Sequence, residues 1–126
     1  MIFKYVSTKK LEENIQVVHF NKHQETEFEF DYYIGRPGIL GNPYTHLTTS
    51  THSKYVVKTR DDAIDSYEDY FYDKLKTDIK FKSEVNKLID IYKNHQKLNL
   101  ICWCKPKRCH GDFLKEYLID YLKNLT

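Results

Sequence analysis

The sequence lacks a hydrophobic run of the roughly 18 residues that a membrane-spanning helix requires. Its amino terminus also lacks the apolar core and the small-residue cleavage site of a secretory signal peptide. Neither a membrane nor the secretory route is therefore indicated. We expect a soluble, cytoplasmic protein that has no membrane partner.

Charge of one sign is not in excess either, because the formal net charge is only +2 and basic side chains are interleaved with acidic ones. Proteins that bind a nucleic-acid duplex carry clustered lysines and arginines that neutralise its phosphates. The composition therefore argues against duplex nucleic acid as a partner. An anionic small molecule remains open, because a single basic loop is enough to hold it.

Cysteine is scarce, and all three cysteines lie within the eight residues 102–109. An odd number of closely spaced cysteines does not suit the disulfide framework of a small secreted domain. The three sulfurs are therefore candidates for metal binding, for thiol chemistry or for plain packing in the core.

The pattern of elements predicts one α/β domain. The 126 residues suffice for a single domain with its own core. Strand-like segments are expected at residues 2–6, 15–20, 28–34 and 98–104. The second and third of these could pair as a hairpin or lie as neighbouring strands. We expect a single compact Rossmann-like domain over residues 1–126, with a mostly parallel central sheet flanked by about three main helices.

The helices are expected from apolar side chains that recur at helical spacing. Thr59 is the expected N-cap of a first helix over about 60–78, and Ser83 is that of a second. A third helix is expected over about 112–124. The side chains expected to be buried in the three helices are Ala63, Ile64, Tyr67, Tyr70, Phe71, Leu75, Val85, Leu88, Ile89, Tyr92, Phe113, Leu114, Tyr117, Leu118, Tyr121 and Leu122.

Residues 35–44 hold three of the four glycines and two of the three prolines of the chain. Glycine lets the backbone approach itself or a ligand closely, and proline stiffens a turn. We therefore expect a shaped loop. In this loop, Arg36 offers a bidentate fork for phosphate or carboxylate, and Asn42 can bind a base edge, a ribose hydroxyl or a backbone group. The alternative is a loop whose polar side chains bond their own backbone.

Residues 98–113 predict a buried strand, a basic loop and a helix start. In open α/β sheets, ligands bind where the carboxyl end of a strand meets the amino end of the next helix, and that helix end favours anions. Arg108 and Gly111 are the candidate ligand contacts here. Arg60 is another, because the helix dipole disfavours a cation at a helix start. The alternative for both arginines is that they are solvated surface charges. His110 and Asp112 are the available acid–base groups. His110 can alternatively bind phosphate or cap the loop, and Asp112 can alternatively cap the helix.

The spacing Cys102-x-Cys104-x4-Cys109-His110 leaves three interpretations open. The four side chains match in kind the ligands that zinc prefers, although structural zinc sites usually join two separated pairs. Cys109 lies at a helix start beside basic residues, which would favour a reactive thiolate. All three cysteines could instead be small residues packed in the core.

Three motifs together resemble a family of small bacterial and phage domains of unknown function. They are Tyr33-Ile-Gly-Arg-x3-Leu-Gly-Asn-Pro43, the helix start at Arg60, and Cys102-x-Cys-x-Pro-x2-Cys-His110. The resemblance covers roughly residues 15–122. It implies that the characteristic positions of the family are Gly35, Arg36, Gly41, Asn42, Arg60, Cys102, Cys104, Cys109 and His110. The chain is also distantly similar to Rossmann-like proteins that bind or process nucleotides, which is a likeness of fold alone.

Two classes of function follow. The first is binding, with or without processing, of a nucleotide- or nucleoside-like anion between loop 35–44 and the helix start at 108–112. A nucleotide or nucleoside hydrolase or transferase is the enzyme class to test, and a phage protein that acts on a nucleotide signal fits the same residues. The second is a zinc-stabilised interaction module or a host-directed inhibitor without catalysis, which would bind a host protein or another copy of the chain. The ligand-binding residues of the first class would be Tyr33, Gly35, Arg36, Gly41, Asn42, Arg60, Arg108, Cys109 and Gly111.

Overall fold

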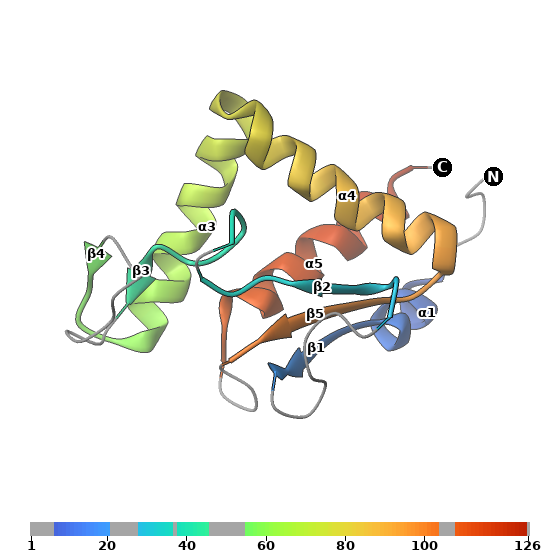
Figure 1. Cartoon of the computed structure of the whole chain (residues 1–126), viewed down its shortest axis with the longest axis horizontal. Helices are drawn as coiled ribbons and strands as arrows, with labels where there is room; N and C mark the ends of the chain where they lie inside the picture. Colours follow the sequence, from blue (N-terminus) through green and yellow to red (C-terminus); the bar gives the residue numbers. More distant parts are fainter. Residues whose placement is uncertain (1–6, 21–27, 37, 46–54, 104–107, 126) are drawn as a thin grey trace.

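The computed structural model describes residues 7–20, 28–36, 38–45, 55–103 and 108–125. Within these ranges the chain forms a three-stranded sheet, a two-stranded sheet and four helices (Figure 1). The elements in chain order are α1 (Thr8–Asn14), β1 (Ile15–His19), β2 (Asp31–Tyr33), β3 (Tyr44–Thr45), β4 (Tyr55–Val56), α3 (Arg60–Thr77), α4 (Ile79–His95), β5 (Leu98–Cys102) and α5 (His110–Lys123). The prediction of an α/β domain with a parallel central sheet is confirmed. The strand predicted over 2–6 lies outside the described residues.

The three strands of the main sheet are parallel and follow the order β1-β5-β2. Segments 15–20 and 28–34 therefore form neither a hairpin nor a neighbouring pair, because β5 lies between them. All five residues of β5 are buried, as the central strand of a parallel sheet requires. The strand predicted over 28–34 is shorter than expected. The carboxylate of Asp31 accepts a hydrogen bond from the Phe28 amide (2.9 Å). Residues 28–30 therefore form a turn, and β2 begins only at Asp31.

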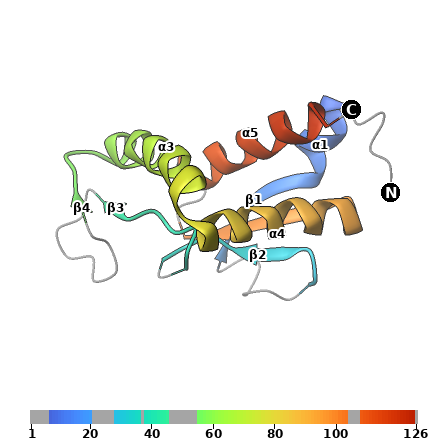
Figure 2. The ribbon, with the colours of Figure 1, turned by 90° about the horizontal axis from the view of Figure 1, so that it is seen from above.

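One face of the main sheet carries the hydrophobic core. Alternate residues of a strand point to opposite faces, and Leu98, Leu100 and Cys102 of β5 all belong to the core cluster. Helix α5 covers this face, since its Gly111 packs against Val17 of β1. Figures 1 and 2 show α5 on one side of the sheet, with α3 beyond its amino end and α4 along the side on which β2 lies.

The opposite face carries a buried polar pair. Ile101 is fully buried but lies outside the core cluster, which agrees with its alternate position on β5. On the same face, Asn99 Nδ2 donates to Asp31 Oδ1 at 2.9 Å. Both side chains of this pair are buried, so β5 and β2 are joined by a side-chain hydrogen bond as well as by their backbone ladder.

The helix starts are set by capping side chains. Helix α3 begins as predicted, with Thr59 Oγ1 accepting a hydrogen bond from the amide three residues on (3.0 Å). The predicted cap at Ser83 is wrong, because α4 already begins at residue 79. Asp78 is the residue between the two helices, and its Oδ1 accepts from the Phe81 amide (3.1 Å). Ser83 therefore lies inside α4.

The helices bury most of the side chains that their periodicity predicts. Tyr121 is an exception, since it is exposed, and Ile119 of the same helix is buried. Helix α5 begins at His110 rather than at about residue 112, with Cys109 in the N-cap position. None of the helices in the described ranges is both long and apolar enough to cross a membrane. The predicted residues that are only partly buried against the core are Tyr70, Leu75, Phe113 and Tyr117.

Candidate functional site

Loop 35–44 lies between the starts of α3 and α5. A side chain of α3 binds the loop, and a side chain of α5 binds the residue directly before it. From α3, the hydroxyl of Tyr67 donates to the carbonyl oxygen of Leu40 (2.8 Å). From α5, Nε2 of His110 lies 2.7 Å from the carbonyl oxygen of Ile34, directly before the loop. The three regions that the sequence assigns to one site are therefore neighbours in the fold.

The loop is built from two consecutive tight turns. The amide of Gly38 donates to the carbonyl oxygen of Gly35 (3.0 Å), and the amide of Gly41 donates to that of Gly38 (2.9 Å). A Cβ atom on Gly41 would lie 3.0 Å from both N and Cα of Arg36. Glycine at this position therefore permits the close approach of backbone to backbone. The predicted shaped loop is confirmed, and it fixes the backbone of Arg36.

Asn42 fastens the end of the loop to α3. Its Nδ2 donates to the carbonyl oxygen of Ala63 (3.0 Å), and its Oδ1 accepts from the amide of Tyr44 (2.9 Å). The side chain is buried. Both ends of the amide thus bind main-chain groups. The Oδ1 contact lies within the loop, as the alternative interpretation predicts, and the Nδ2 contact reaches α3.

Arg36 has an unsatisfied donor. Its Nη1 atom is buried and has no hydrogen-bond partner among the residues that the structure describes. The guanidinium lies close enough to His110 for its charge to lower the pKa of that imidazole. A buried donor without an acceptor costs free energy. An anion bound at this guanidinium would supply an acceptor and remove that cost.

His110 is buried, and its ring centroid lies 4.8 Å from that of Tyr67. Burial lowers the pKa of His110 from 6.5 to about 4, an effect that the carbonyl of Ile34 opposes and the charge of Arg36 reinforces. The imidazole is therefore neutral at neutral pH. Since a carbonyl oxygen only accepts, Nε2 must donate the hydrogen bond to Ile34. The ring thus ties α5 to the end of β2, and its role as an acid–base group stays a prediction.

The start of α5 packs tightly on the sheet and is capped by its own side chain. A Cβ atom on Gly111 would lie 2.8 Å from Ile34 Cδ1 and from Val17 Cγ1, so the missing side chain allows the helix to approach the strands. Asp112 Oδ2 accepts a hydrogen bond from the Cys109 amide (3.1 Å). The capping interpretation of Asp112 is confirmed, and its role in proton transfer stays a prediction.

Arg108 is compensated by two carboxylates of α3. Its Nη1 lies 2.9 Å from Asp61 Oδ1, and its Nη2 lies 3.2 Å from Asp65 Oδ1. These ion pairs join the segment before α5 to the first turns of α3. Arg60, the first residue of α3, is half-buried. Arg36 is therefore better placed than Arg108 to hold the charge of a ligand.

Two of the three cysteines are in contact. Sγ of Cys102, at the end of β5, lies 3.4 Å from Sγ of Cys109, and both residues are buried. Cys104 lies outside the described residues. Within the described ranges, no three His, Cys, Asp or Glu side chains are grouped closely enough to hold a metal ion. The four-ligand zinc site therefore stays a prediction, and the packing of Cys102 and Cys109 in the core is confirmed.

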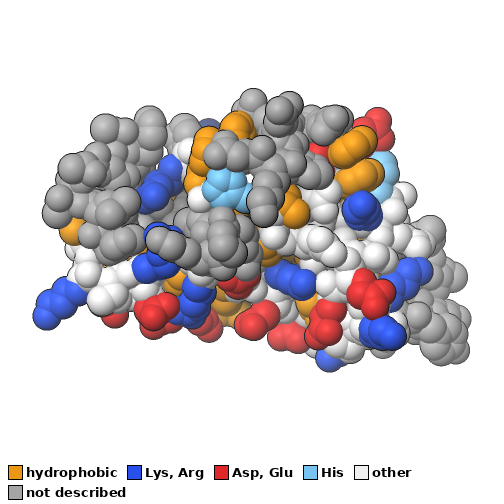
Figure 3. Space-filling model, turned by 90° about the horizontal axis from the view of Figure 1, so that it is seen from below, with side chains coloured by type: hydrophobic (Ala, Val, Ile, Leu, Met, Phe, Trp, Pro, Cys, Tyr) orange, Lys and Arg blue, Asp and Glu red, His pale blue; other side chains and the backbone are white. Residues whose placement is uncertain are grey.

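Four aromatic side chains gather where the three parallel strands end, and we call them the aromatic shelf: His19, Phe20, Tyr33 and Trp103. Phe20 stacks on Trp103 with ring centroids 4.2 Å apart, and His19 meets the edge of Trp103 at 5.9 Å. Figure 3, which views the side on which β1 lies, shows hydrophobic side chains exposed on that face. Only Tyr33 was predicted to bind a ligand. For His19, Phe20 and Trp103, the sequence signal of a ligand contact is their position at the ends of predicted strands.

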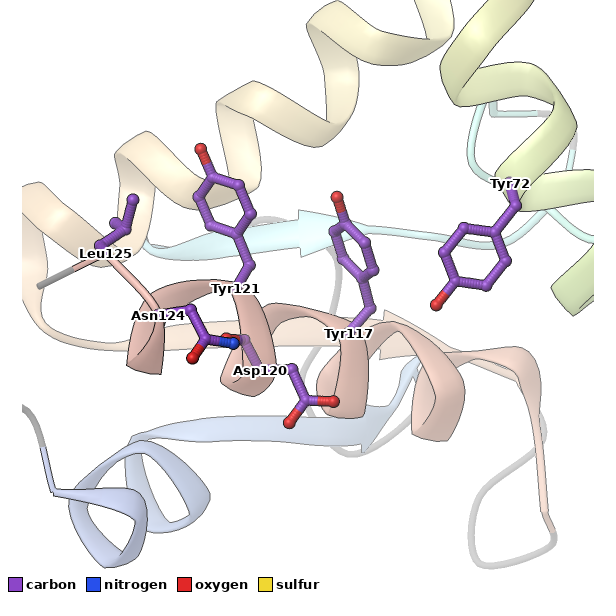
Figure 4. Close-up of a pocket in the computed structure, with 6 residues that line it drawn as sticks. All are labelled: Tyr72, Tyr117, Asp120, Tyr121, Asn124 and Leu125. Atoms are coloured by element: carbon purple, nitrogen blue, oxygen red, sulfur yellow. The ribbon is translucent and has the colours of Figure 1, made fainter.

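A separate groove of about 310 Å³ lies over the second half of α5. Figure 4 shows Tyr117 and Tyr121 projecting from α5 in the same direction, with Tyr72 approaching from α3. None of the predicted site residues lines it. The lining residues are Tyr72, Tyr117, Asp120, Tyr121, Asn124 and Leu125.

One comparison with known proteins gives a match. A family model described as "Domain of unknown function (DUF4326)" matches residues 18–120, which include loop 35–44, the starts of α3 and α5, and the aromatic shelf. No curated protein and no solved structure matches the chain. The predicted resemblance to a family of small domains of unknown function is confirmed at that level.

Proposed function

The chain belongs to DUF4326, a family of domains of unknown function, and we propose that it binds a nucleotide-like anionic small molecule whose phosphate lies against Arg36. The observation that carries the proposal is the buried Nη1 atom of Arg36, which has no hydrogen-bond partner in the described part of the chain. A phosphate oxygen at this guanidinium would supply the missing acceptor and compensate the charge. Arginine suits this task because its planar fork matches the geometry of a phosphate group.

The position of Arg36 supports the same assignment. The residue follows β2 at the carboxyl edge of the parallel sheet, where ligands of open α/β folds bind. The start of α5 lies beside it, and the positive end of a helix dipole favours an anion. The carboxylate of Asp112 already accepts the hydrogen bond of one amide there. Arg36 must therefore supply most of the positive charge.

The proposal concerns binding. The two groups predicted to transfer protons both hold the main chain: Nε2 of His110 is engaged with Ile34, and the carboxylate of Asp112 is engaged with Cys109. Neither group is presented to a ligand by these contacts. A catalytic step therefore forms no part of the proposed function.

Isothermal titration calorimetry with AMP, ADP, UMP, UDP and inorganic pyrophosphate tests the proposal. We expect at least one nucleotide to bind the wild-type protein and the Arg36→Met variant to bind it roughly ten- to a hundredfold more weakly, because hydrogen bonds to charged groups are worth about 1.5–3 kcal/mol. Arg108→Met is the matched control, since this arginine is exposed and paired with Asp61 and Asp65. It should bind within a few-fold of the wild type.

Two results would contradict the proposal. The first is a panel in which no compound binds the wild-type protein. The second is binding that Arg36→Met leaves unchanged, whatever the effect of Arg108→Met. Thermal unfolding of both variants establishes that they are folded, so that a loss of binding is assigned to the side chain.

A further inference from the structure

The aromatic shelf is attached to Arg36 by a chain of two hydrogen bonds. Nε1 of Trp103 donates to the hydroxyl of Tyr33 (2.9 Å), and that hydroxyl donates to the carbonyl oxygen of Arg36 (2.8 Å). A Cβ atom on Gly35 would clash with the Tyr33 ring. Glycine at position 35 therefore lets the Tyr33 ring lie against the loop and join the shelf to the proposed anion site.

Trp103 is the member of the shelf that is best placed to meet a ligand. It is 51% exposed although it follows the central, fully buried strand β5. Phe20 stacks on it, His19 contacts its edge, and Tyr33 accepts the hydrogen bond of its indole. The ring is therefore oriented by three neighbours and still offers aromatic surface to solvent.

We propose that the exposed surface of Trp103 stacks on the base of the nucleotide whose phosphate binds Arg36, so that Trp103 makes the site select nucleotides over sugar phosphates. This inference rests on the proposed function. A planar ring and an anion are the two parts that a nucleotide presents together. The structure offers an oriented indole, linked through Tyr33 to the backbone carbonyl of Arg36, and a buried Nη1 atom on the side chain of the same arginine that has no acceptor in the described part of the chain. Any base has an aromatic face, so stacking selects for the presence of a base.

AMP and ribose 5-phosphate make a direct test, because they share the phosphate and the sugar and differ in the base. Stacking on an aromatic side chain predicts that the wild-type protein binds AMP roughly five- to 150-fold more tightly than ribose 5-phosphate. Trp103 is the only tryptophan of the chain. Intrinsic fluorescence therefore reports on this ring alone, and AMP should quench it where ribose 5-phosphate does not.

Three variants separate stacking from an indirect effect through Tyr33. Trp103→Ala should reduce the preference for AMP to near one, measured by calorimetry. Trp103→Phe retains an aromatic ring but loses the hydrogen bond to Tyr33, and it should recover most of the preference. Phe28→Ala is the control, because Phe28 is an exposed aromatic residue before β2, at the opposite end of that strand from Tyr33. It should leave the preference unchanged.

The outcomes distinguish this inference from the proposed function. If AMP and ribose 5-phosphate bind equally well and both depend on Arg36, the stacking role is wrong and the anion site stands. Retention of the full AMP preference in Trp103→Ala would have the same meaning. If neither of these compounds and no nucleotide of the calorimetry panel binds the wild-type protein, both proposals are overturned.

Discussion

Nε2 of His110 lies 2.7 Å from the carbonyl oxygen of Ile34 and donates a hydrogen bond to it from within the core. The contact joins the first residue of α5 to the residue that follows β2. The hydrogen bond requires a hydrogen on Nε2. Because the site is buried, a second proton on the ring would place an unfavourable positive charge in the core. The start of α5 and the loop that carries Arg36 are thus held together by a neutral histidine.

The first prediction concerns pH. The pKa of His110 is lowered from 6.5 to about 4 in the folded protein, so the unfolded chain binds a proton at a higher pH than the folded chain does. The contribution of His110 to stability is therefore fully present above about pH 6.5 and is lost as the pH falls towards 4. Between pH 7 and 4.5 the wild type should lose roughly 2–3 kcal/mol more than His110→Gln, measured by urea unfolding. Equal losses in the two proteins, or an imidazole that titrates near 6.5 by NMR, would contradict this.

The second prediction concerns Gly111. Replacing glycine by alanine inside a helix normally stabilises it, but here the added methyl group would lie 2.8 Å from Ile34 and Val17. Overpacking of this kind costs about 1–3 kcal/mol. We therefore expect Gly111→Ala to lower the free energy of unfolding. A variant as stable as the wild type, or more stable, would show that α5 does not approach the sheet this closely.

The third prediction concerns the start of α4. Asp78→Ala removes the side chain that accepts from the Phe81 amide and should destabilise the protein by about 0.5–2 kcal/mol. Asp78→Asn keeps an acceptor and should cost less. Ser83→Ala changes a residue inside the helix and should be close to neutral. Chemical denaturation decides, and a larger loss for Ser83→Ala than for Asp78→Ala would reverse the assignment.

The fourth prediction concerns the buried polar pair of the sheet. Asn99→Leu removes the hydrogen bond from Nδ2 to Asp31 Oδ1 and places an apolar group against a buried carboxylate. We expect a loss of about 1–3 kcal/mol in the free energy of unfolding. Gln16→Leu is the control, because Gln16 is the β1 partner of Asn99 in the sheet register and is exposed. Similar effects of the two substitutions would mean that the pair contributes little.

The fifth prediction separates the stability of Arg36 from its function. Because its Nη1 has no acceptor within the described part of the chain, replacing the guanidinium by an apolar side chain removes a buried donor that has no acceptor there. Ligand-free Arg36→Met should therefore unfold at the same temperature as the wild type or at a higher one. A clear drop in its melting temperature would show that the guanidinium has a structural partner.

The sequence predicts what depends on local pattern. The cap of α3 at Thr59 and the burial of Phe71, Leu88 and Leu118 are predicted correctly. These features depend on residues close in the sequence, through helical periodicity and a capping side chain. The cap of α4 was misassigned because both Asp78 and Ser83 are capping residues. Helix α4 begins after Asp78 with Ile79, an apolar residue that is 88% exposed and therefore does not belong to the buried face of the helix.

What the sequence leaves open depends on tertiary contacts. Strand β5 lies between β1 and β2, and all five of its residues are buried. An apolar run predicts a buried strand, but it does not show which two strands will lie beside it. The same holds for the candidate site. Arg36 and Arg108 are equivalent as basic residues in loops, and only the fold shows that Asp61 and Asp65 compensate Arg108. Trp103 gains its significance from Tyr33, which is 70 positions away in the sequence.

A heteronuclear NMR titration of the labelled protein with AMP is the sharpest test of the proposed anion site at Arg36. We expect the largest shifts on the amides of Gly35 and Gly41, on those of His110 and Gly111, and on the side-chain Nε–H of Arg36. The same titration of Arg36→Met should leave these amides in place at matched AMP concentrations. Shifts confined to the groove around Tyr117 and Tyr121, or shifts that persist in Arg36→Met, would show that AMP does not bind at Arg36.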